Sequence, residues 1–497
     1  MDRVTSTYEH ALQAAYYDIG NRGIVVDPAR VAQAKAIVQA EITRQLAIAS
    51  TQWGCKVFIG AENNPVEEKD GTFSGAVNLN ATQGKYRLLD KLKSLGYEIP
   101  KVSVKNDEGE YESKESTQEL VLQKILLKNQ FGYPGGDPSI KAILKVREYA
   151  KLRSAYLNAL LYKQGDLSLW LSNYNVAGTL TGRRSCRCHT FGYGGNSQTF
   201  PKHSDIAHLA RRCYVARPGN ILLMVDQISA EDWPVSALAE NHNALAELRS
   251  GTDRHTKLAS NIFGIPLNAK TPEEWKESIE RYLGKKTRHA SNYDERANMM
   301  SESLIKEGHF IPVPQCQKLL DRMGELDPNI KRVFHKYVQD TISNTRMLKT
   351  PFGRERLFLG ARPNDHNSTV FKEAYAYIPQ SVVGDNTGFA VLALESQYPV
   401  AERTIVQEGH DSVVQDVRDD VETVYKYLLR TQAAFKRTIK FHNGIELEIP
   451  IEAEVGYDFN TTVKIKEFTR AGVKAAIEKL KEKVAKLAKE EGDMVRI

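Results

Sequence analysis

The chain has 497 residues, of which 41% are hydrophobic and 26% charged, and its formal net charge is +6. This composition excludes a disordered or collagen-like chain, and the length predicts about three domains or one enzyme with several lobes. The five cysteines are few and odd in number, which indicates a reducing compartment and no disulfide framework. The small positive charge is compatible with a polyanionic partner but does not identify one.

Membrane and secretory segments are not expected. The sequence contains no apolar run of 18 residues, the length that a spanning helix needs. The first 20 residues carry three acidic side chains and no apolar segment, which excludes a secretory signal peptide. We therefore expect a cytoplasmic protein without a membrane partner.

The first third of the chain is predicted to be mostly helical. Residues 1–50 predict two helices, and the second starts at Asp27-Pro28, where Asp caps the helix and Pro suits its first turn. Turn-forming residues predict irregular structure over 51–117. Apolar residues that recur on one face predict further helices over 118–130 and 138–163.

The middle of the chain has a different character. Residues 175–202 are rich in Gly, Asn, Thr and Arg and predict a loop. The apolar run Ile221–Val225 predicts a buried strand that ends at Asp226. Residues 232–345 predict mostly helices.

Two strand patterns and a helix follow. Residues 404–417 predict two strands around a turn at Gly409-His410, and alternation over 446–454 predicts an edge strand. Residues 471–491 predict a helix with an apolar stripe of Val473, Ile477, Leu480, Val484 and Leu487. The stripe predicts packing back on the body of the protein or, as the alternative, self-association or binding of an accessory or processivity protein.

Two aspartates suggest a metal site. Asp226 ends a buried strand, where a carboxylate is costly unless it is paired or binds a cation. Asp411 lies at the tip of the predicted hairpin. If the two strand ends are neighbours, the carboxylates form a site for divalent metals that supports phosphoryl transfer. The alternative is that each is an ordinary turn aspartate.

Two basic clusters suit phosphates. Lys285, His289 and Tyr293 are four residues apart on a predicted helix, so they line one face with charge for a triphosphate and a ring for base and sugar. Residues 179–187 contain three arginines that suit a phosphate backbone. The alternatives are a solvated helix face and an exposed basic loop.

A zinc site is weakly supported. Cys186, Cys188 and His189 lie together, and His203 and Cys213 follow downstream. This spacing lacks the clear second pair of ligands that a structural zinc site needs.

In chain order, these segments resemble the polymerase domain of the DNA polymerase I family, the A family of DNA-dependent DNA polymerases, from about residue 10 to about residue 460. The similar segments are RGIVVD (22–27), TLTGRRS (179–185), NSQTFPK (196–202), ILLMVDQISAEDW (221–233), GTDRHTKLA (251–259), KKTRHASNYDERA (285–297), TPFGRERLF (350–358), AYIPQSVVGD (376–385) and GHDSVV (409–414). Their common order is a stronger argument than any one segment.

The resemblance implies a helix-rich α/β (α+β) fold of the right-hand polymerase type. It implies a thumb over 1–165, a palm over 166–233 and 366–460, fingers over 234–365, and a C-terminal helical extension over 461–497.

The resemblance also implies an activity and the residues that carry it. The chain would add deoxynucleotides to a primer 3′-hydroxyl on a DNA template, in replication or repair, with primer–template DNA and dNTPs as partners. Catalytic Asp226 and Asp411, with the backbone carbonyl of Gln227, would hold two Mg²⁺ ions, for which Mn²⁺ can substitute. The implied nucleotide-binding residues are Glu231, which would exclude a 2′-hydroxyl, His255, Lys285, His289 and Tyr293. The implied DNA-binding residues are Arg183, Gln198, Gln380 and His410.

The sequence departs from the family pattern at several positions. His289 stands where a Lys is usual, and Lys286 and Arg288 are the nearest replacements. Asp294 stands where a Gly follows the aromatic residue, and Ser412 where a Glu often follows the second Asp. These differences suggest a divergent, phage-like member, which would act in the cytoplasm of a bacterial host.

Three further expectations concern activity. Because the sequence begins near the start of the thumb region, we expect no 3′–5′ exonuclease and no intrinsic proofreading. One alternative is a related polymerase that uses an RNA template, as a reverse transcriptase does. Another alternative is a nucleic-acid-binding protein with a decayed active site.

Overall fold

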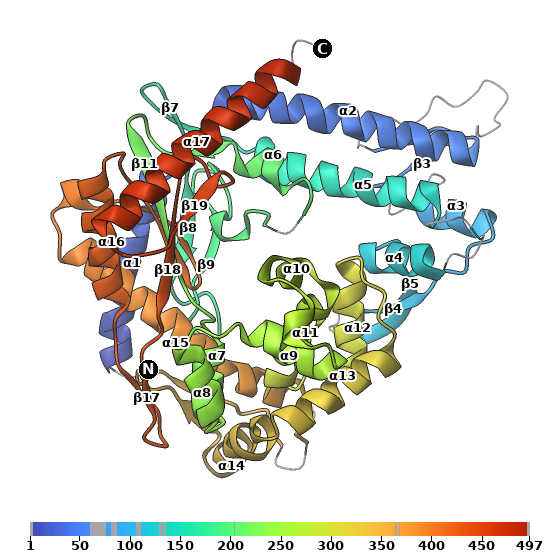
Figure 1. The fold of residues 1–497 in the computed structure, drawn as a ribbon. Coiled ribbons are helices and arrows are strands. Elements are labelled where there is room, and N and C mark those ends of the chain that lie inside the picture. The colour runs from blue at the N-terminus through green and yellow to red at the C-terminus, as the bar shows by residue number, and fades with distance from the viewer. Residues whose placement is uncertain are drawn as a thin grey trace. The chain divides into compact units, whose positions relative to one another are not determined.

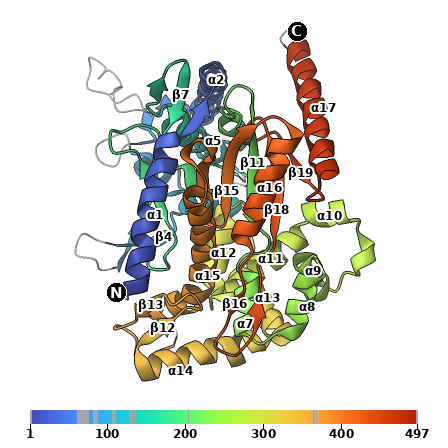
Figure 2. The ribbon, with the colours of Figure 1, turned by 90° about the vertical axis from the view of Figure 1, so that its left-hand side faces the viewer.

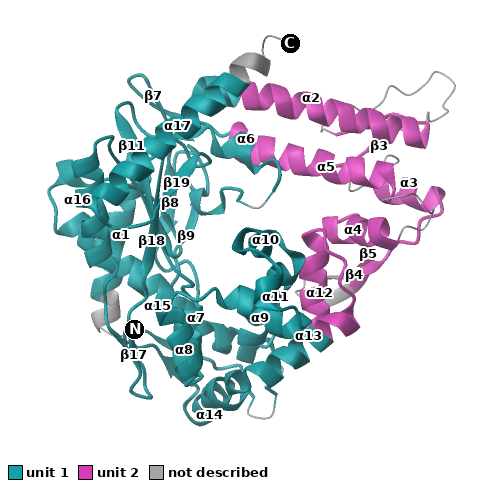
Figure 3. Ribbon diagram, in the orientation of Figure 1, with its two compact units in different colours: residues 1–31, 159–296, 318–497 teal, residues 32–158, 297–317 magenta. Residues whose placement is uncertain are grey.

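The computed structural model describes residues 3–59, 76–80, 87–105, 111–128, 132, 136–202, 204–362, 365–366 and 368–494. The chain forms two compact units (Figures 1 and 3). Unit 1 comprises Met1–Val31, Ala159–Arg296 and Lys318–Ile497, and unit 2 comprises Ala32–Asn158 and Ala297–Gln317. The combination of many helices with antiparallel sheets confirms the predicted helix-rich α/β class.

A five-stranded antiparallel sheet with the order β14-β15-β11-β18-β19 forms the centre of unit 1 (Figure 1). Its strands are β11 (Asn220–Gln227), β14 (Ile405–Gly409), β15 (Ser412–Arg418), β18 (Ile451–Gly456) and β19 (Thr462–Ile465). The side chains from Ile221 to Val225 are all buried, so β11 needs cover on both faces and lies in the middle of the sheet. The predicted buried strand and the predicted hairpin over 404–417 are confirmed.

Helices pack against this sheet. Helix α16 (Val421–Phe435) packs on β11, β15 and β18, while α1 (Arg3–Arg22) packs on β14 and on α15 (Thr369–Ser396). Figure 2 shows α16 and α17 (Arg470–Met494) beside β18 and β19. The hydrophobic core of this region includes Leu223, Val225 and Val413, which are almost fully buried.

The apolar stripe of the C-terminal helix packs on unit 1. Val473, Ile477 and Leu480 are buried in the core beside β18, β19 and α16, and Val484 is partly buried against the same core. The predicted helix is confirmed, and its first half packs back on the body of the protein. A partner helix could use this stripe only if these side chains left the core.

The edge strand predicted over 446–454 is wrong in its bounds and its position. Short β17 (Glu446–Leu447) pairs with β16 (Ile439–Lys440), and β18 begins separately at Ile451. Pro450 separates the two strands because proline has no N–H to donate to a ladder. Strand β18 is interior, because it pairs with β11 on one side and β19 on the other.

A second sheet of unit 1 has the order β10-β1-β7-β6. Its strands are β1 (Ile24–Val26), β6 (Tyr162–Gln164), β7 (Leu167–Trp170) and β10 (Tyr214–Val215). The helix predicted over 138–163 is therefore too long: α5 (Pro138–Leu152) continues as a π-helical turn to Leu157, and β6 follows. Gly165-Asp166 forms the hairpin turn between β6 and β7, a sequence feature that the helical periodicity obscured.

The loop predicted over 175–202 is also wrong in part. Residues Ser185–Cys188 form β9, which pairs with β8 (Ser172–Asn175). A short 3₁₀ turn at Ser197–Thr199 follows, capped by the side chain of Asn196. This hairpin carries the predicted DNA-binding segment beside the central sheet.

The helical region of unit 1 surrounds a second core that includes Trp233, Phe334 and Tyr377. Its elements are α7 (Asp232–Leu238), α8 (His242–Arg249), α9 (Arg254–Phe263), α10 (Pro272–Glu277), α11 (Ile279–Asn292), α14 (Lys336–Thr345), β12 (Met347–Lys349) and β13 (Glu355–Leu357). Helix α6 (Ala207–Arg211) lies elsewhere in unit 1 and precedes β10 in the chain. Helices α9 and α11 approach closely because Gly284 has no side chain: an added Cβ would lie 3.3 Å from the Ala259 Cβ. The prediction of mostly helices over 232–345 is confirmed.

Unit 2 is built mainly of helices (Figure 3). It contains most of α2 (Pro28–Trp53) with α3 (Leu88–Ser94), α4 (Glu119–Lys128), α5 and α12 (Ala297–Lys306), and α13 (Val313–Leu326) begins in it. Its described residues also form the short strands β2 (Val57–Phe58), β3 (Val77–Asn78), β4 (Lys101–Lys105) and β5 (Tyr111–Glu115). Thus 51–117, predicted to be irregular, contains short elements, and 60–75, 81–86 and 106–110 lie outside the described residues.

The start of α2 agrees with its sequence. The Asp27 carboxylate accepts hydrogen bonds from the backbone N–H groups of Ala29 (2.9 Å) and Arg30 (3.2 Å), as predicted for a helix cap. Within the described ranges, no helix combines the length and apolarity needed to cross a membrane.

Candidate active site

The central sheet brings Asp226 and Asp411 to the same end. Asp226 lies opposite Ser412 in the register of β11 and β15, and Asp411 lies in the β14–β15 turn. The backbone N–H of Gln227 donates to the carbonyl of Asp411 at 3.1 Å, which ties the turn to the end of β11. His410 makes the turn possible by adopting a left-handed backbone conformation (φ 51°).

Burial makes this carboxylate pair unfavourable without a cation. Burial, together with repulsion from Asp411, raises the pKa of Asp226 to about 7, and burial also raises the pKa of Asp411. The Lys202 ammonium acts in the opposite direction on both groups. One buried oxygen of Asp226, Oδ1, has no hydrogen-bond partner among the described residues. An unpartnered carboxylate oxygen beside a second carboxylate suits a hard divalent cation such as Mg²⁺.

Gln227 fixes the strand end from behind. Its buried side-chain amide donates to the Thr387 hydroxyl at 2.9 Å, and its amide oxygen accepts from Asn386 at 2.7 Å. Both partners lie on α15, so the side chain anchors β11 to that helix. Its predicted metal-binding role concerned only the backbone carbonyl.

Arg183, His289 and Tyr293 lie around the carboxylate of Glu231. Glu231 precedes α7 and accepts short hydrogen bonds from the Arg183 guanidinium and the Tyr293 hydroxyl. The Nε2 atom of His289 lies 3.6 Å from a Glu231 oxygen, and its ring meets that of Tyr293 edge-on, with centroids 5.3 Å apart. Arg183, predicted to bind DNA, therefore has an acidic partner in the folded chain.

Helix α11 places Lys285 and His289 on its exposed side. The sequence predicted that Tyr293 continues this helical face, but the helix ends at Asn292 and Tyr293 is the residue that follows it. Asp294 then adopts a left-handed conformation (φ 53°), which explains why the related pattern has a glycine there.

Arg288 cannot stand in for the missing lysine of this helix. It is buried and forms an ion pair with Asp327 at 3.5 Å. Lys286 lies over the Tyr282 ring, 5.8 Å from its centroid. His289 therefore remains the exposed residue of this turn beside Glu231.

His255 lies on α9, which packs against α11. Burial lowers its pKa to about 4, and the nearby Lys285 ammonium acts in the same direction. The imidazole is therefore neutral at neutral pH. Its Nδ1 atom is buried without a hydrogen-bond partner among the described residues, so the ring has an unused polar atom near Lys285.

Of the remaining predicted DNA-binding residues, Gln198 and His410 lie at the β14–β15 hairpin and Gln380 lies on α15. Gln198 donates to the Glu408 carboxylate at 2.8 Å. Burial, followed by repulsion from Arg183, lowers the pKa of His410 to about 4. Gln380 is half-buried on α15.

Sequence reasoning missed a buried network behind these residues. Glu408 is fully buried, and burial raises its pKa to about 7 despite the Arg184 guanidinium. Arg184 is also fully buried and donates to the Tyr8 hydroxyl at 3.0 Å. The order Glu-Gly-His-Asp before β15 is a sequence signal for Glu408, whereas Tyr8 is too distant in the chain to be found in that way.

Arg354 forms a second missed network. Its guanidinium makes two hydrogen bonds to Asp385, at 2.8 and 3.0 Å, and one to Glu9, at 2.8 Å. These contacts join the segments TPFGRERLF and AYIPQSVVGD to α1. The arrangement positions α15, which carries Gln380.

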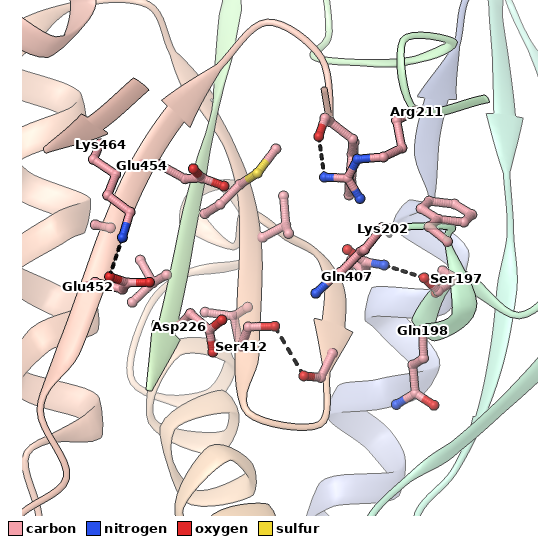
Figure 4. Close-up of a pocket in the computed structure, with 18 residues that line it drawn as sticks. Ser197, Gln198, Lys202, Arg211, Asp226, Gln407, Ser412, Glu452, Glu454 and Lys464 are labelled. Atoms are coloured by element: carbon pink, nitrogen blue, oxygen red, sulfur yellow. Dashed lines mark hydrogen bonds and ion pairs between the residues drawn. The ribbon is translucent and has the colours of Figure 1, made fainter. Parts of the chain in front are cut away.

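A cavity of about 270 Å³ opens beside Asp226 (Figure 4). Figure 4 shows the Lys202 ammonium directed into it toward Asp226 and Ser412. On the wall opposite Lys202, Lys464 forms an ion pair with Glu452 at 2.6 Å. Beside Asp226, the Ser412 hydroxyl donates to the carbonyl of Gly409 at 3.1 Å. The cavity thus has an acidic end at Asp226 and cationic side chains near it.

A zinc site is not formed by the described residues. Cys186 and Cys213 are buried while Cys188 is exposed, and His203 lies outside the described residues. In the described ranges, no three His, Cys, Asp or Glu side chains gather closely enough to hold a metal ion. The carboxylate pair Asp226 and Asp411 is the arrangement that suits a cation.

Comparisons with known proteins agree with this geometry. The family model for DNA polymerase family A matches residues 61–461. The thermostable DNA polymerase I of Thermus aquaticus is 24% identical over 329 residues, which cover 64% of this chain and 36% of that protein. The thermostable DNA polymerase I of Thermus thermophilus is 24% identical over 410 residues, which cover 80% of this chain and 43% of that protein. The chain therefore spans about a third to two fifths of the length of these relatives.

A solved structure shares the fold. It is described as the POL domain of Pol1 from M. smegmatis in complex with DNA primer-template and dNTP. The TM-score is 0.67 at 18% identity, and the match covers 90% of this chain and 69% of that one. At this identity the likeness shows the fold, and it confirms the predicted polymerase architecture.

Proposed function

Because the chain belongs to DNA polymerase family A, we propose that it is a DNA-templated DNA polymerase that adds deoxynucleotides to a primer 3′-hydroxyl. The observation that carries the proposal is the half-buried carboxylate pair Asp226 and Asp411 at the end of the central sheet, in which the buried Oδ1 atom of Asp226 has no hydrogen-bond partner among the described residues. The proposed substrates are primer–template DNA and dNTPs, the molecules bound in the similar solved structure.

Asp226, Asp411 and the backbone carbonyl of Gln227 would hold two Mg²⁺ ions, for which Mn²⁺ can substitute. When bound, the metal supplies charge stabilisation for attack of the primer hydroxyl on the α-phosphate and for departure of pyrophosphate. The protein supplies a rigid strand end, because the Gln227 side chain is anchored to α15. Lys202 offsets part of the negative charge before the site is loaded.

The incoming nucleotide is proposed to bind between α11 and Glu231. Lys285 and His289 would contact the triphosphate, and His255 would assist as a neutral hydrogen-bonding group. Tyr293 would lie against the sugar and base. Glu231, held by Arg183 and Tyr293, would fill the space of a 2′-hydroxyl and thus favour deoxynucleotides.

The template and primer are proposed to contact Arg183, Gln198, Gln380 and His410. In the folded chain Arg183 donates to Glu231 and Gln198 donates to Glu408. Binding of DNA would therefore exchange or share these hydrogen bonds. The proposed bounds are thumb 1–165, palm 166–233 and 366–460, fingers 234–365 and C-terminal extension 461–497.

Primer extension tests the proposal. A primed DNA template with four dNTPs and Mg²⁺ should be extended by the wild-type chain and not by Asp411→Ala, while primer–template binding by the variant is retained. Extension by Asp411→Ala at the wild-type rate would refute the metal assignment. Binding without extension by the wild type, in Mg²⁺ and in Mn²⁺, would instead favour a nucleic-acid-binding protein with an inactive site.

Two parallel assays separate the finer alternatives. An RNA template in place of DNA tests for reverse transcription. The chain is also proposed to lack 3′–5′ proofreading, and release of nucleotides from a mismatched primer end by the purified protein would contradict this.

A further inference from the structure

The loop 189–195, which follows β9, carries aromatic rings on the surface of unit 1. Phe191 in this loop is 76% exposed, and Tyr162 on β6 is 41% exposed. The His189 ring centroid lies 5.5 Å from that of Phe191 and 6.4 Å from that of Tyr193. The Tyr193 ring in turn meets that of Tyr162 edge-on, with centroids 5.4 Å apart. These four rings form one group, which we call the aromatic cluster.

Hydrogen bonds of the backbone fix this loop. The N–H of His189 donates to the Tyr193 carbonyl at 2.9 Å, and the N–H of Gly192 donates to the His189 carbonyl at 2.8 Å. Gly194 has a φ of 61°, and an added Cβ would lie 2.0 Å from the carbonyl oxygen of Leu171, so only glycine fits there. The exposure of the phenyl ring at the tip is therefore a property of a folded turn.

The surroundings of the aromatic cluster are basic. Residues 159–204 contain five basic side chains and one acidic side chain, Asp166. Arg187 precedes the loop on β9, Lys163 follows Tyr162 on β6, and both basic side chains are exposed. Cationic side chains attract phosphates, and the faces of aromatic rings stack on bases. The combination therefore suits a nucleic acid strand whose bases are unpaired, because the bases of a duplex already stack on one another.

We propose that the aromatic cluster, with Phe191 at its exposed end, is a stacking site for the unpaired bases of single-stranded DNA. The loop connects β9, which follows Arg183, to the 3₁₀ turn that carries Gln198. The site thus adjoins, along the chain, two residues proposed to contact primer–template. It rests on that proposed function, since a primed template carries unpaired bases beyond the primer. Every base has a ring face, so we expect binding with little sequence preference.

Photo-cross-linking locates the site. A single-stranded DNA that carries iododeoxyuridine is irradiated with the full chain, and the cross-linked peptides are identified by mass spectrometry. We expect cross-links to peptides that contain Phe191 or Tyr162, and several-fold fewer from a blunt duplex that carries the same base. Absence of cross-links to these peptides, or equal yields from the blunt duplex, would overturn the proposal.

Binding of a labelled poly(dT) strand tests the stacking itself. Phe191→Ala and Phe191→Leu should each weaken binding about fivefold or more, the effect of losing one stacked base, whereas Phe191→Trp should retain it. Tyr17→Ala is the matched control, because Tyr17 is 67% exposed on α1 but is followed by the acidic Asp18. Wild-type affinity of Phe191→Ala or Phe191→Leu, or an equal loss in Tyr17→Ala, would refute stacking. The Tm should not change in any variant, because both rings are mostly exposed.

The outcomes separate this proposal from the polymerase assignment. Addition of one nucleotide at saturating DNA should be the same for the wild type and Phe191→Ala. Absence of addition by the wild type would refute the polymerase assignment, while the cross-links and the loss of affinity would still support the stacking site. Normal addition with no cross-link and unchanged affinity would refute the stacking site alone and would favour a protein as the partner of this surface.

Discussion

Replacement of Asp226 by asparagine should abolish primer extension and at the same time stabilise the metal-free protein. The carboxylate lies at the end of β11, where burial and repulsion from Asp411 raise its pKa to about 7. Asparagine has nearly the same shape and no charge. The variant therefore removes an unfavourable buried charge that the active protein keeps for its function.

The magnitude follows from the pKa. A rise from 3.8 to about 7 corresponds to about 4 kcal/mol, at 1.36 kcal/mol for each tenfold change in proton affinity. Because the asparagine amide must also find hydrogen-bond partners, we expect a stabilisation of about 2 to 4 kcal/mol at pH 8. The corresponding rise in Tm is roughly 5 °C for a unit of this size.

The dependence on pH is the decisive feature. Above pH 7 the Asp226 carboxylate is ionised in the folded and unfolded states, so the folded wild type bears the full free-energy cost of the buried charge. As the pH falls from about 7 to about 4, Asp226 takes up a proton in the folded state before it does so in the unfolded state. The free energy of unfolding of the wild type therefore rises toward that of the variant. The advantage of Asp226→Asn should therefore disappear near pH 4.

Thermal unfolding in EDTA, measured from pH 4 to pH 8, tests this reasoning. The exposed residue Asp166 provides the control, and Asp166→Asn should leave the Tm of the protein nearly unchanged. A Tm for Asp226→Asn at or below that of the wild type at pH 8, or a difference that does not vary with pH, would refute the argument.

Four further substitutions test the site. Glu231→Ala should reduce the preference for dNTPs over NTPs at least tenfold, seen in the ratio of kcat/KM values; an unchanged ratio would remove its proposed role. His289→Ala should raise the dNTP KM several-fold at constant Tm, whereas Arg288→Ala should lower the Tm because it leaves a buried carboxylate unpaired; the reverse pattern would contradict the assigned helix faces. Arg354→Ala should lower the stability by about 3 to 5 kcal/mol by leaving Asp385 without its partner, measured by urea unfolding, and a loss below 1 kcal/mol would contradict it.

Sequence patterns predicted the parts of the site whose structure depends on residues close together in the chain. The apolar run before Asp226 predicts a strand, and the pattern around Gly409-His410 predicts a hairpin, so both aspartates were expected at strand ends. The proximity of the two ends depends on the pairing of β11 with β15, which no local pattern specifies. The expectation that the two strand ends lie together came from the resemblance of the ordered segments to the polymerase family.

The parts that were missed depend on contacts between distant residues. The Arg354 pair with Glu9 joins residues 345 positions apart, and the Arg184 contact with Tyr8 joins residues 176 positions apart. The prediction of an edge strand over 446–454 was wrong for a related reason. Alternation describes one strand, whereas the position of β18 inside the sheet depends on its two neighbours.

The pairing of β11 also determines when the protein can fold during its synthesis. Asp226 lies opposite Ser412 on one side and opposite Glu452 on the other, so β11 leaves the ribosome long before either partner strand exists. Contacts between residues so far apart make folding slow and leave apolar strands exposed meanwhile. The strand that carries the proposed catalytic aspartate is therefore the part of the nascent chain that we expect to depend most on chaperones.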